Sequence, residues 1–170
     1  GSMLEMINDG LDMLEAGKYR AMVMGHQGEN FCAGANIAGI LQFCENKDWN
    51  GLEKTVKIFQ DLTQKIRFSK APVVAAPFHL SLGGGFEFIA PAAKRVSAAE
   101  LYIGAVEVGI GLIPGAGGNL RLILNMMENA GKTGRLNVFP LVQKAFETIG
   151  FAKVATSAEE AKHLGYLLSS

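Results

Sequence analysis

Apolar positions along the chain follow two periods, one typical of buried strands and one of amphipathic helices. Strand-like apolar runs occupy 20–25 (RAMVMG) and 71–77 (APVVAAP), with shorter candidates at 95–99 and 101–106. Residues spaced for one helical face predict helices over 4–16, 37–44, 51–68, 86–93, 120–127 and 139–149. Because strands and helices alternate several times, we expect an α/β protein with mostly parallel strand pairing.

The sequence also predicts the loops and helix ends that connect these elements. Gly17 is expected to stop the first helix, and a loop over 26–36 follows the first strand. A polar loop is expected over 128–137, and 151–156 is expected to be a strand or an extended connection. Ser157 and Glu160 form a capping box for a last helix that holds Ala161 and Leu164.

The 170 residues, 49% of them hydrophobic, are enough for one domain with a sizeable core. We expect a single domain over 3–170, since no internal repeat and no linker divides the chain. Gly1 and Ser2 precede Met3 and are expected to be a cloning scar, so they are left out of the fold prediction.

The charges argue against nucleic acid and anionic membranes as partners. Sixteen basic and sixteen acidic residues cancel, and neither sign forms a long run. Cys32 and Cys44 are the two cysteines, which fits a reduced cytosolic protein better than a disulfide scaffold. No apolar stretch is long enough to cross a bilayer. These features predict a cytoplasmic location.

Two glutamates in glycine-rich frames carry the strongest chemical signal. Glu87 follows the three glycines of 83–85 directly, and Glu107 precedes a turn built on Pro114 and Gly115. Burial of a carboxyl group disfavours its charged form, which moves its pKa toward proton transfer near neutral pH. Glycines let backbone N–H groups approach a ligand and face a developing negative charge. The pair therefore suggests one acid that handles a water and one that delivers a proton.

Plainer interpretations stand beside this one. Glu87 could be a charge at a helix start, Glu107 a surface acid, and the glycines tight turns. Cys32 is expected to be a packing residue, and His26, His79 and His163 share no metal-ligand spacing. Sequences resembling a phosphate loop at 130–133 and a dinucleotide fingerprint at 109–114 each lack a required glycine. We therefore expect the chain itself to bind neither ATP nor NAD.

Three motifs in order resemble the crotonase (enoyl-CoA hydratase/isomerase) superfamily: FCAGAN at 31–36, LGGGFE at 82–87 and VEVGIGLIPGAGG at 106–118. The resemblance implies a crotonase-like (ClpP/crotonase) α/β fold of repeated ββα units. The resemblance is narrowed to one subgroup of the superfamily by three further segments: PVVAAPF, AKVATSAEEAKHLGYL and the polar insert near 128–137. They resemble the hydratase domain of bacterial multifunctional 3-hydroxyacyl-CoA dehydrogenase/enoyl-CoA hydratase proteins of fatty-acid β-oxidation.

The resemblance also implies a reaction and its residues. The N–H groups of Ala35 and Gly84 would form an oxyanion hole for the thioester of a trans-2-enoyl-CoA. Glu87 would activate a water that attacks C3, Glu107 would protonate C2, and the Gly115 N–H would help to place the water. Carbonyls near Ala33 and Ile37 would contact the adenine end of CoA. The product would be a 3-hydroxyacyl-CoA. No metal and no redox cofactor is implied, because NAD belongs to the separate dehydrogenase domain.

The chain also departs from the family pattern. A strand hairpin usually precedes the first helix, and further helices that cover the acyl pocket and build trimers usually follow. A fragment truncated at both ends is therefore expected, with the dehydrogenase domain of its parent chain and possible homo-oligomers as partners. Asn36, Val106 and the segment 77–79 (PFH) differ from common family residues. The residues leave acyl chain length and oligomeric state open.

Two rival functions remain. An enoyl-CoA isomerase can work with one acid–base group, so the presence of two glutamates disfavours it. A catalytically incomplete fragment that only binds acyl-CoA or assists assembly is the second rival.

Overall fold

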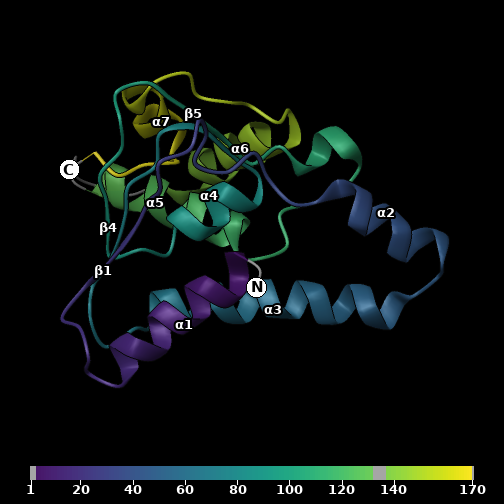
Figure 1. Ribbon diagram of the computed structural model, residues 1–170. Helices are drawn as coiled ribbons and strands as arrows, with labels where there is room; N and C mark the ends of the chain where they lie inside the picture. Colours follow the sequence, from purple (N-terminus) through teal and green to yellow (C-terminus); the bar gives the residue numbers. More distant parts are fainter. Residues whose placement is uncertain (1–2, 132–136, 170) are drawn as a thin grey trace.

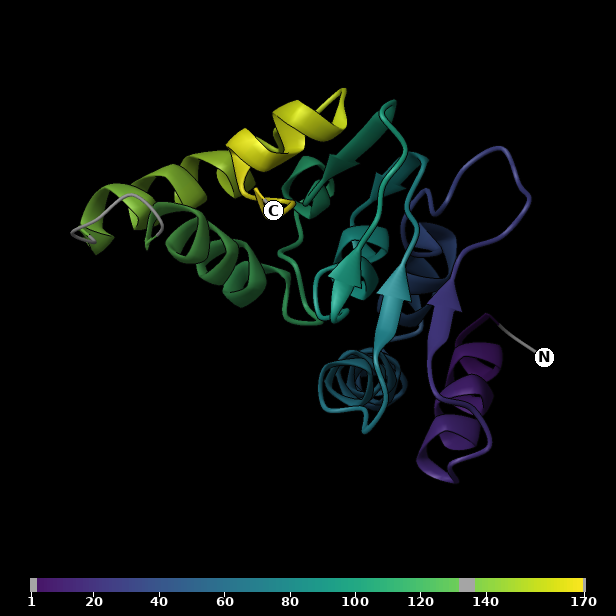
Figure 2. The same ribbon diagram turned by 90° about the vertical axis from the view of Figure 1, so that its left-hand side faces the viewer.

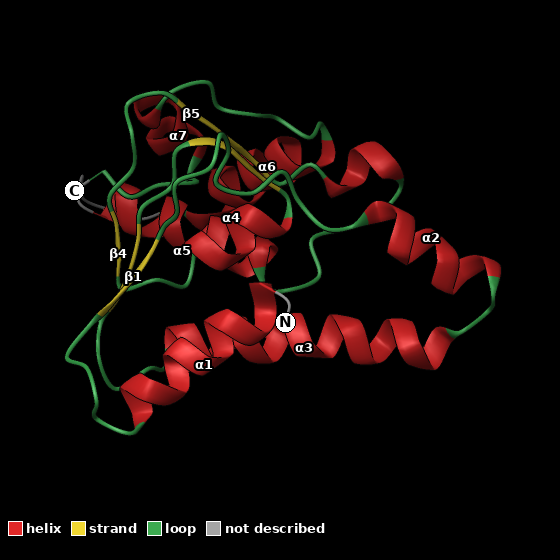
Figure 3. Cartoon of the chain, viewed as in Figure 1, coloured by secondary structure: helices red, strands yellow, loops and turns green. Residues whose placement is uncertain are grey.

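The computed structural model describes residues 3–131 and 137–169. Its elements follow the predicted alternation of strands and helices (Figure 1; Figure 3). In chain order they are α1 (Met3–Glu15), β1 (Met22–Met24), α2 (Ile37–Glu45), α3 (Trp49–Arg67), β2 (Val73–Ala75), β3 (His79–Leu82), α4 (Gly84–Ile89), β4 (Lys94–Arg95), β5 (Leu101–Gly104), the 3₁₀ helix η1 (Glu107–Ile110), α5 (Gly118–Gly131), α6 (Val138–Gly150) and α7 (Ala158–Leu164).

The strands form two small parallel sheets, and the chain visits them in turn. One sheet has the order β1-β2-β4, with Val74 paired to both Val23 and Lys94. The other pairs β3 with β5, and a parallel bridge between Cys32 and Ser81 extends it. Each passage through both sheets leads into a helix, first α2, then α4, then α5 by way of η1. The predicted parallel pairing and repeated ββα units are confirmed.

The core lies between these sheets and the helices that cover them. The apolar face of α1 buries Ile7, Leu11 and Leu14, and α3 buries Leu62 and Ile66 beside it. In Figure 1, α1 lies along one half of α3, while the other half of α3 and α2 project from the body. Helices α5 and α6 run side by side at the opposite end (Figure 2). Helix α4 sits at the centre with every residue buried.

Four expectations about the elements need correction. Strand β3 was not predicted, because its buried residue is the polar Ser81 rather than one of its leucines. The helix expected over 86–93 begins at Gly84 and ends at Ile89. The strand expected over 95–99 is confined to its first residue, because β4 ends at Arg95. Segment 151–156, by contrast, agrees with the connection expected as the alternative to a strand, and it has one isolated antiparallel bridge at Ala155. The loop predicted over 128–137 is wrong up to residue 131, since α5 continues to Gly131. Residues 132–136, like the cloning scar at 1–2, lie outside the described residues.

The ends of two helices match their sequence signals. Gly17, just past α1, has φ +70°, a value that glycine adopts without strain. The Ser157 hydroxyl accepts from the Glu160 N–H at 3.1 Å, as the capping box predicts. The Glu160 carboxylate, however, accepts from the N–H and hydroxyl of Thr156. Across the described part of the chain, no helix is both long and apolar enough to cross a membrane.

Candidate active site

One apolar cavity of about 470 Å³ is lined by all seven residues to which the family resemblance assigns a role in catalysis or CoA binding. Its rim and floor come from the loop after β1, the start of α4, and the segment from η1 to α5. The predicted residues that line it are Ala33, Ala35, Ile37, Gly84, Glu87, Glu107 and Gly115. Apolar side chains of α1, α2, α3 and η1 form the rest of the wall. They include Leu4, Phe43, Leu52, Phe59 and Ile110.

Glu87 is held in the cavity by backbone donors from a distant loop. Its side chain is 5% exposed, and its Oε1 accepts from the N–H groups of Ala116 and Gly118, both at 2.8 Å. Burial raises the pKa of Glu87, whereas the N–H groups of Gly118, Ala116 and Gly115 act in the opposite direction. The two short bonds favour the ionised form of this carboxyl group and leave Oε2 available to the cavity.

Glu107 stands in a different electrostatic environment at the first residue of η1. Its Oε2 is buried, with no hydrogen-bond partner among the described residues. Burial raises the pKa of Glu107 and is the largest effect. Its own backbone N–H opposes burial by a smaller amount, and the charge of the neighbouring Glu87, the smallest of the three effects, raises the pKa further. Two nearby carboxyl groups with unequal donors separate into one that ionises first and one that keeps its proton. The geometry therefore favours ionisation of Glu87 before Glu107.

The glycines bring the two acids and the backbone loops together. Gly83 has φ +54°, and a Cβ built on it would lie 3.2 Å from Oε1 of Glu107. A Cβ on Gly85 would lie 2.8 Å from the Cβ of Cys32, so the 31–36 loop packs directly on the start of α4. This contact supports the expected packing role of Cys32.

The N–H groups of Ala35 and Gly84 have no acceptor within the described residues. Gly84 is the first residue of α4, where a backbone N–H has no carbonyl one turn earlier to bind. Because both residues line the cavity, their N–H groups are available to a ligand oxygen there.

Sequence reasoning missed several contributors to this site. The N–H donors of Ala116 and Gly118 lie inside the motif at 106–118, but the sequence analysis assigned no role to them. Gln60 and Thr63 of α3 were not considered. Gln60 Nε2 donates to the Gly115 carbonyl at 2.9 Å, and Thr63 Oγ1 lies 2.8 Å from the Ala116 carbonyl. These contacts span more than fifty residues, so no local spacing signals them.

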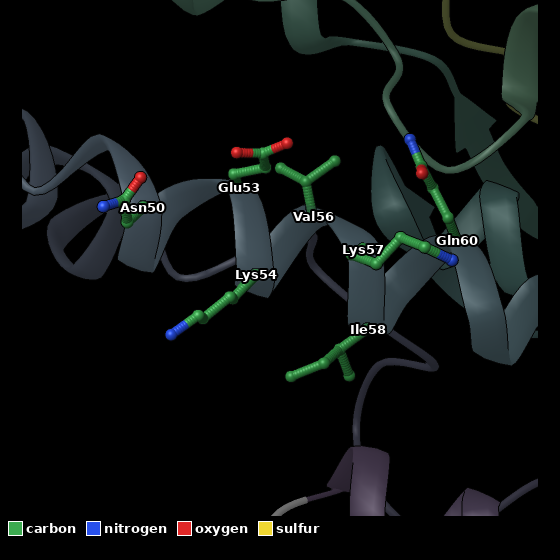
Figure 4. Close-up of a pocket in the computed structure, with 7 residues that line it drawn as sticks. All are labelled: Asn50, Glu53, Lys54, Val56, Lys57, Ile58 and Gln60. Carbon is green, nitrogen blue, oxygen red and sulfur yellow. The ribbon is translucent and has the colours of Figure 1, made fainter.

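A second hollow lies along the outward side of α3 (Figure 4). Its lining residues are Asn50, Glu53, Lys54, Val56, Lys57, Ile58 and Gln60. They are side chains of a single solvated helix, and no second acid accompanies Glu53. This hollow offers neither converging backbone donors nor a buried carboxyl pair, so the cavity of Glu87 and Glu107 is the candidate active site.

Comparisons with known proteins agree with this architecture. A family model described as enoyl-CoA hydratase/isomerase matches residues 1–169. A "Probable 3-hydroxyacyl-CoA dehydrogenase" of Bacillus subtilis (strain 168) is 42% identical over 97% of this chain, which covers 20% of that relative. A "Probable enoyl-CoA hydratase" of the same organism is 31% identical over 71% of this chain and 46% of the relative.

Solved structures give the same result. Enoyl-CoA hydratase from Thermoplasma volcanium GSS1 has a TM-score of 0.73 at 29% identity, and the match covers 98% of this chain and 61% of that one. Enoyl-CoA hydratase from Bacillus anthracis has a TM-score of 0.73 at 27% identity, over 96% and 57% of the two chains. The chain belongs to the enoyl-CoA hydratase/isomerase family and has its crotonase fold. It spans less than two thirds of the length of each of these four proteins.

Proposed function

We propose that this chain is an enoyl-CoA hydratase domain of fatty-acid β-oxidation, a lyase that converts a trans-2-enoyl-CoA into a 3-hydroxyacyl-CoA. The observation that carries the proposal is the pair of glutamates in one cavity, of which Glu87 is bound by two N–H groups and Glu107 has an unpartnered buried oxygen. Addition of water to a conjugated double bond needs a base that activates the water and an acid that protonates carbon, both facing the same substrate.

Glu87 acts on the water. With Oε1 held by Ala116 and Gly118, its Oε2 accepts a proton from a water as the water oxygen bonds to C3 of the substrate. The Gly115 N–H, beside the same carboxylate, helps to place this water. Glu107 then gives its proton to C2, so water is added across the double bond and the C2–C3 bond becomes single.

The backbone N–H groups of Ala35 and Gly84 receive the negative charge that develops on the thioester oxygen. Neither N–H group has an acceptor in the described chain, so no protein hydrogen bond has to be broken when substrate enters. One such donor is worth about 3–4 kcal/mol of transition-state stabilisation. The carbonyls near Ala33 and Ile37 contact the adenine end of CoA. The described residues contain no cluster of three or more metal-ligating side chains, and the assigned steps use no metal or redox cofactor.

The longer relatives suggest the context of this domain. A curated relative that matches 97% of this chain is named as a dehydrogenase, and this chain covers 20% of it. A relative from Rickettsia felis is named a "Putative fatty acid oxidation complex trifunctional enzyme". We infer a multifunctional parent whose separate dehydrogenase domain uses NAD to oxidise the 3-hydroxyacyl-CoA. The domain would work in the cytoplasm on acyl-CoA, in assemblies that the family builds from trimers.

The test is loss of the conjugated thioester absorbance of crotonyl-CoA. The parent chain should consume the absorbance, and Glu107→Gln and Glu87→Gln should each lose about 10²–10⁴-fold in rate. Glu53→Gln is the matched control, because Glu53 lies on the solvated side of α3. Equal rates for all three variants would refute the assigned roles.

Two outcomes favour the rival functions. A chain that shifts a double bond and tolerates Glu87→Gln would be an isomerase. A chain with no activity that is still stabilised thermally by acyl-CoA would be a binding fragment, because a ligand of the native state raises apparent stability.

A further inference from the structure

The peptide group between Gly115 and Ala116 connects α3 to Glu87. Its carbonyl accepts from Gln60 Nε2 at 2.9 Å, and its N–H donates to Glu87 Oε1 at 2.8 Å. Figure 4 shows the Gln60 side chain leaving α3 toward the neighbouring loop. Hydrogen bonds at both ends of one amide polarise each other, so the donor strength of Ala116 depends on Gln60.

The two adjacent carbonyls of this loop are held as well. The Thr63 hydroxyl, on a side chain that is 3% exposed, shares its proton between the Ala116 carbonyl at 2.8 Å and the Gln60 carbonyl at 2.9 Å. Asn119 Nδ2 donates to the Pro114 carbonyl at 3.2 Å. Three successive carbonyls thus accept from side chains, which fixes the rotation of the peptides that face Glu87.

We propose that Gln60 and Thr63 are positioning residues that hold the Ala116 N–H on Oε1 of Glu87, so that Oε2 alone receives the reacting water. This inference rests on the hydratase function proposed above. The two short bonds, from the N–H groups of Ala116 and Gly118, both end on Oε1, so neither of them occupies Oε2. A carboxylate pinned through one oxygen cannot rotate the other away from the substrate, so geometry is set before substrate binds.

The positioning role predicts a specific loss of activity when the hydrogen bonds from Gln60 and Thr63 to the Gly115 and Ala116 carbonyls are removed. Without Gln60 the Gly115–Ala116 peptide can turn, the charge of Glu87 loses part of its stabilisation, and the acid takes up a proton at higher pH. Substrate contacts elsewhere in the cavity are unchanged, so the loss falls on kcat rather than KM. Glu107 is the titratable group coupled to this carboxylate, since the charge of Glu87 raises the pKa of Glu107, and it is present in every variant below.

Four variants separate the loss of the Gln60 and Thr63 hydrogen bonds from general effects of substitution. Gln60→Met keeps the length of the side chain and removes the donor. Thr63→Val keeps the shape of the buried side chain, and Thr63→Ser restores the hydroxyl. Gln64→Met is the matched control, since Gln64 lies one turn further along α3, is exposed, and has no side-chain hydrogen bond in the described structure.

Two readouts are compared. The first is the titration of Glu87 followed by NMR on chains carrying ¹³C at glutamate carboxyl groups, assigned through its absence in Glu87→Gln. The second is the pH profile of crotonyl-CoA hydration. Gln60→Met and Thr63→Val should shift the Glu87 midpoint upward and lower kcat about 5- to 10-fold, with KM within about twofold. Thr63→Ser and Gln64→Met should match the parent.

An unchanged Glu87 midpoint in both Gln60→Met and Thr63→Val would overturn the positioning role, as would a kcat loss of equal size in Gln64→Met. If the parent chain does not hydrate crotonyl-CoA, the proposed function fails, and the Glu87 titration decides the positioning role by itself.

Discussion

Glu87 Oε1 and the backbone N–H of Gly118 are joined by a 2.8 Å hydrogen bond, so the acid of α4 rests against the first residue of α5. No side chain fits between them. A Cβ on Gly118 would lie 3.0 Å from Oε1 and 3.1 Å from Cγ of Glu87, and 3.2 Å from Cβ of Pro114. Gly118 therefore ties the position of Glu87 to the packing of α5.

Replacement of this glycine should displace the acid without changing any charge. We expect Gly118→Ala to lower kcat for crotonyl-CoA by about 10-fold, because the contacts require Glu87 to move by a few tenths of an ångström, less than the shift of about 1 Å that costs about 10²-fold. Overpacking should also lower the free energy of unfolding by about 1–3 kcal/mol. Steady-state kinetics and urea unfolding measure the two effects.

Gly150→Ala is the control for the Gly118 variant, because a Cβ at the end of α6 would meet no atom within 4 Å. It should leave both quantities close to those of the parent. A Gly118→Ala chain with normal kcat would show that Glu87 can move without loss of function.

The buried oxygen of Glu107 predicts how stability depends on pH. Burial raises the pKa of Glu107 above its ordinary value of 4.5, so the folded chain binds a proton there that the unfolded chain has released. Stability is therefore lost as pH rises from the ordinary value through the raised pKa of the folded state. Glu107→Gln removes this loss. Its unfolding free energy should exceed that of the parent at pH 8, and the gap should close toward pH 4.

Urea unfolding of both chains from pH 4 to pH 8 tests this expectation. Glu53→Gln serves as the control, because an exposed acid on α3 should give the same difference at every pH. A Glu107→Gln chain no more stable than the parent at pH 8 would mean that Glu107 is stabilised in its charged form.

Most helices and strands of this fold could be predicted from the sequence, but the long-range hydrogen bonds around the site could not. The stripe through Ile7, Leu11 and Leu14 predicted α1 because these side chains share one buried face. Strand β3 escaped because Ser81, not a leucine, faces the core, with its hydroxyl unpartnered in the described structure. The motifs led to Glu87 and Glu107 in one cavity, as the structure has them. Gln60 could not be predicted, because its contact with Gly115 depends on the tertiary path of α3.

Tyr166 connects the end of the chain to both glutamate-bearing segments. It is fully buried, its hydroxyl accepts from the Ala105 N–H at 3.2 Å and donates to the Lys153 carbonyl at 2.7 Å. Its ring packs edge-on against Phe86, next to Glu87, with centroids 4.9 Å apart. Burial raises the pKa of Tyr166 to about 12, so the hydroxyl keeps its proton.

Tyr166→Phe should leave the buried Ala105 N–H and the partly buried Lys153 carbonyl without this partner. We expect the free energy of unfolding to fall by about 1–3 kcal/mol, measured by urea titration. Tyr102→Phe is the matched control, because its hydroxyl makes an exposed 3.5 Å contact with Glu100 and its loss should cost under about 0.5 kcal/mol. Equal stability of the two variants would mean that the buried hydroxyl of Tyr166 contributes nothing net to folding.

Gly83 separates backbone strain from contact with the acid. Its φ of +54° disfavours any side chain, and a Cβ there would lie 3.2 Å from Oε1 of Glu107. Gly17 has φ +70° but no atom within 4 Å of such a Cβ. Both alanine variants should lose stability, by about 1–2 kcal/mol from strain. Only Gly83→Ala should also slow hydration of crotonyl-CoA, because it pushes on the proton donor. If Gly17→Ala slowed hydration equally, strain rather than contact with Glu107 would explain the loss.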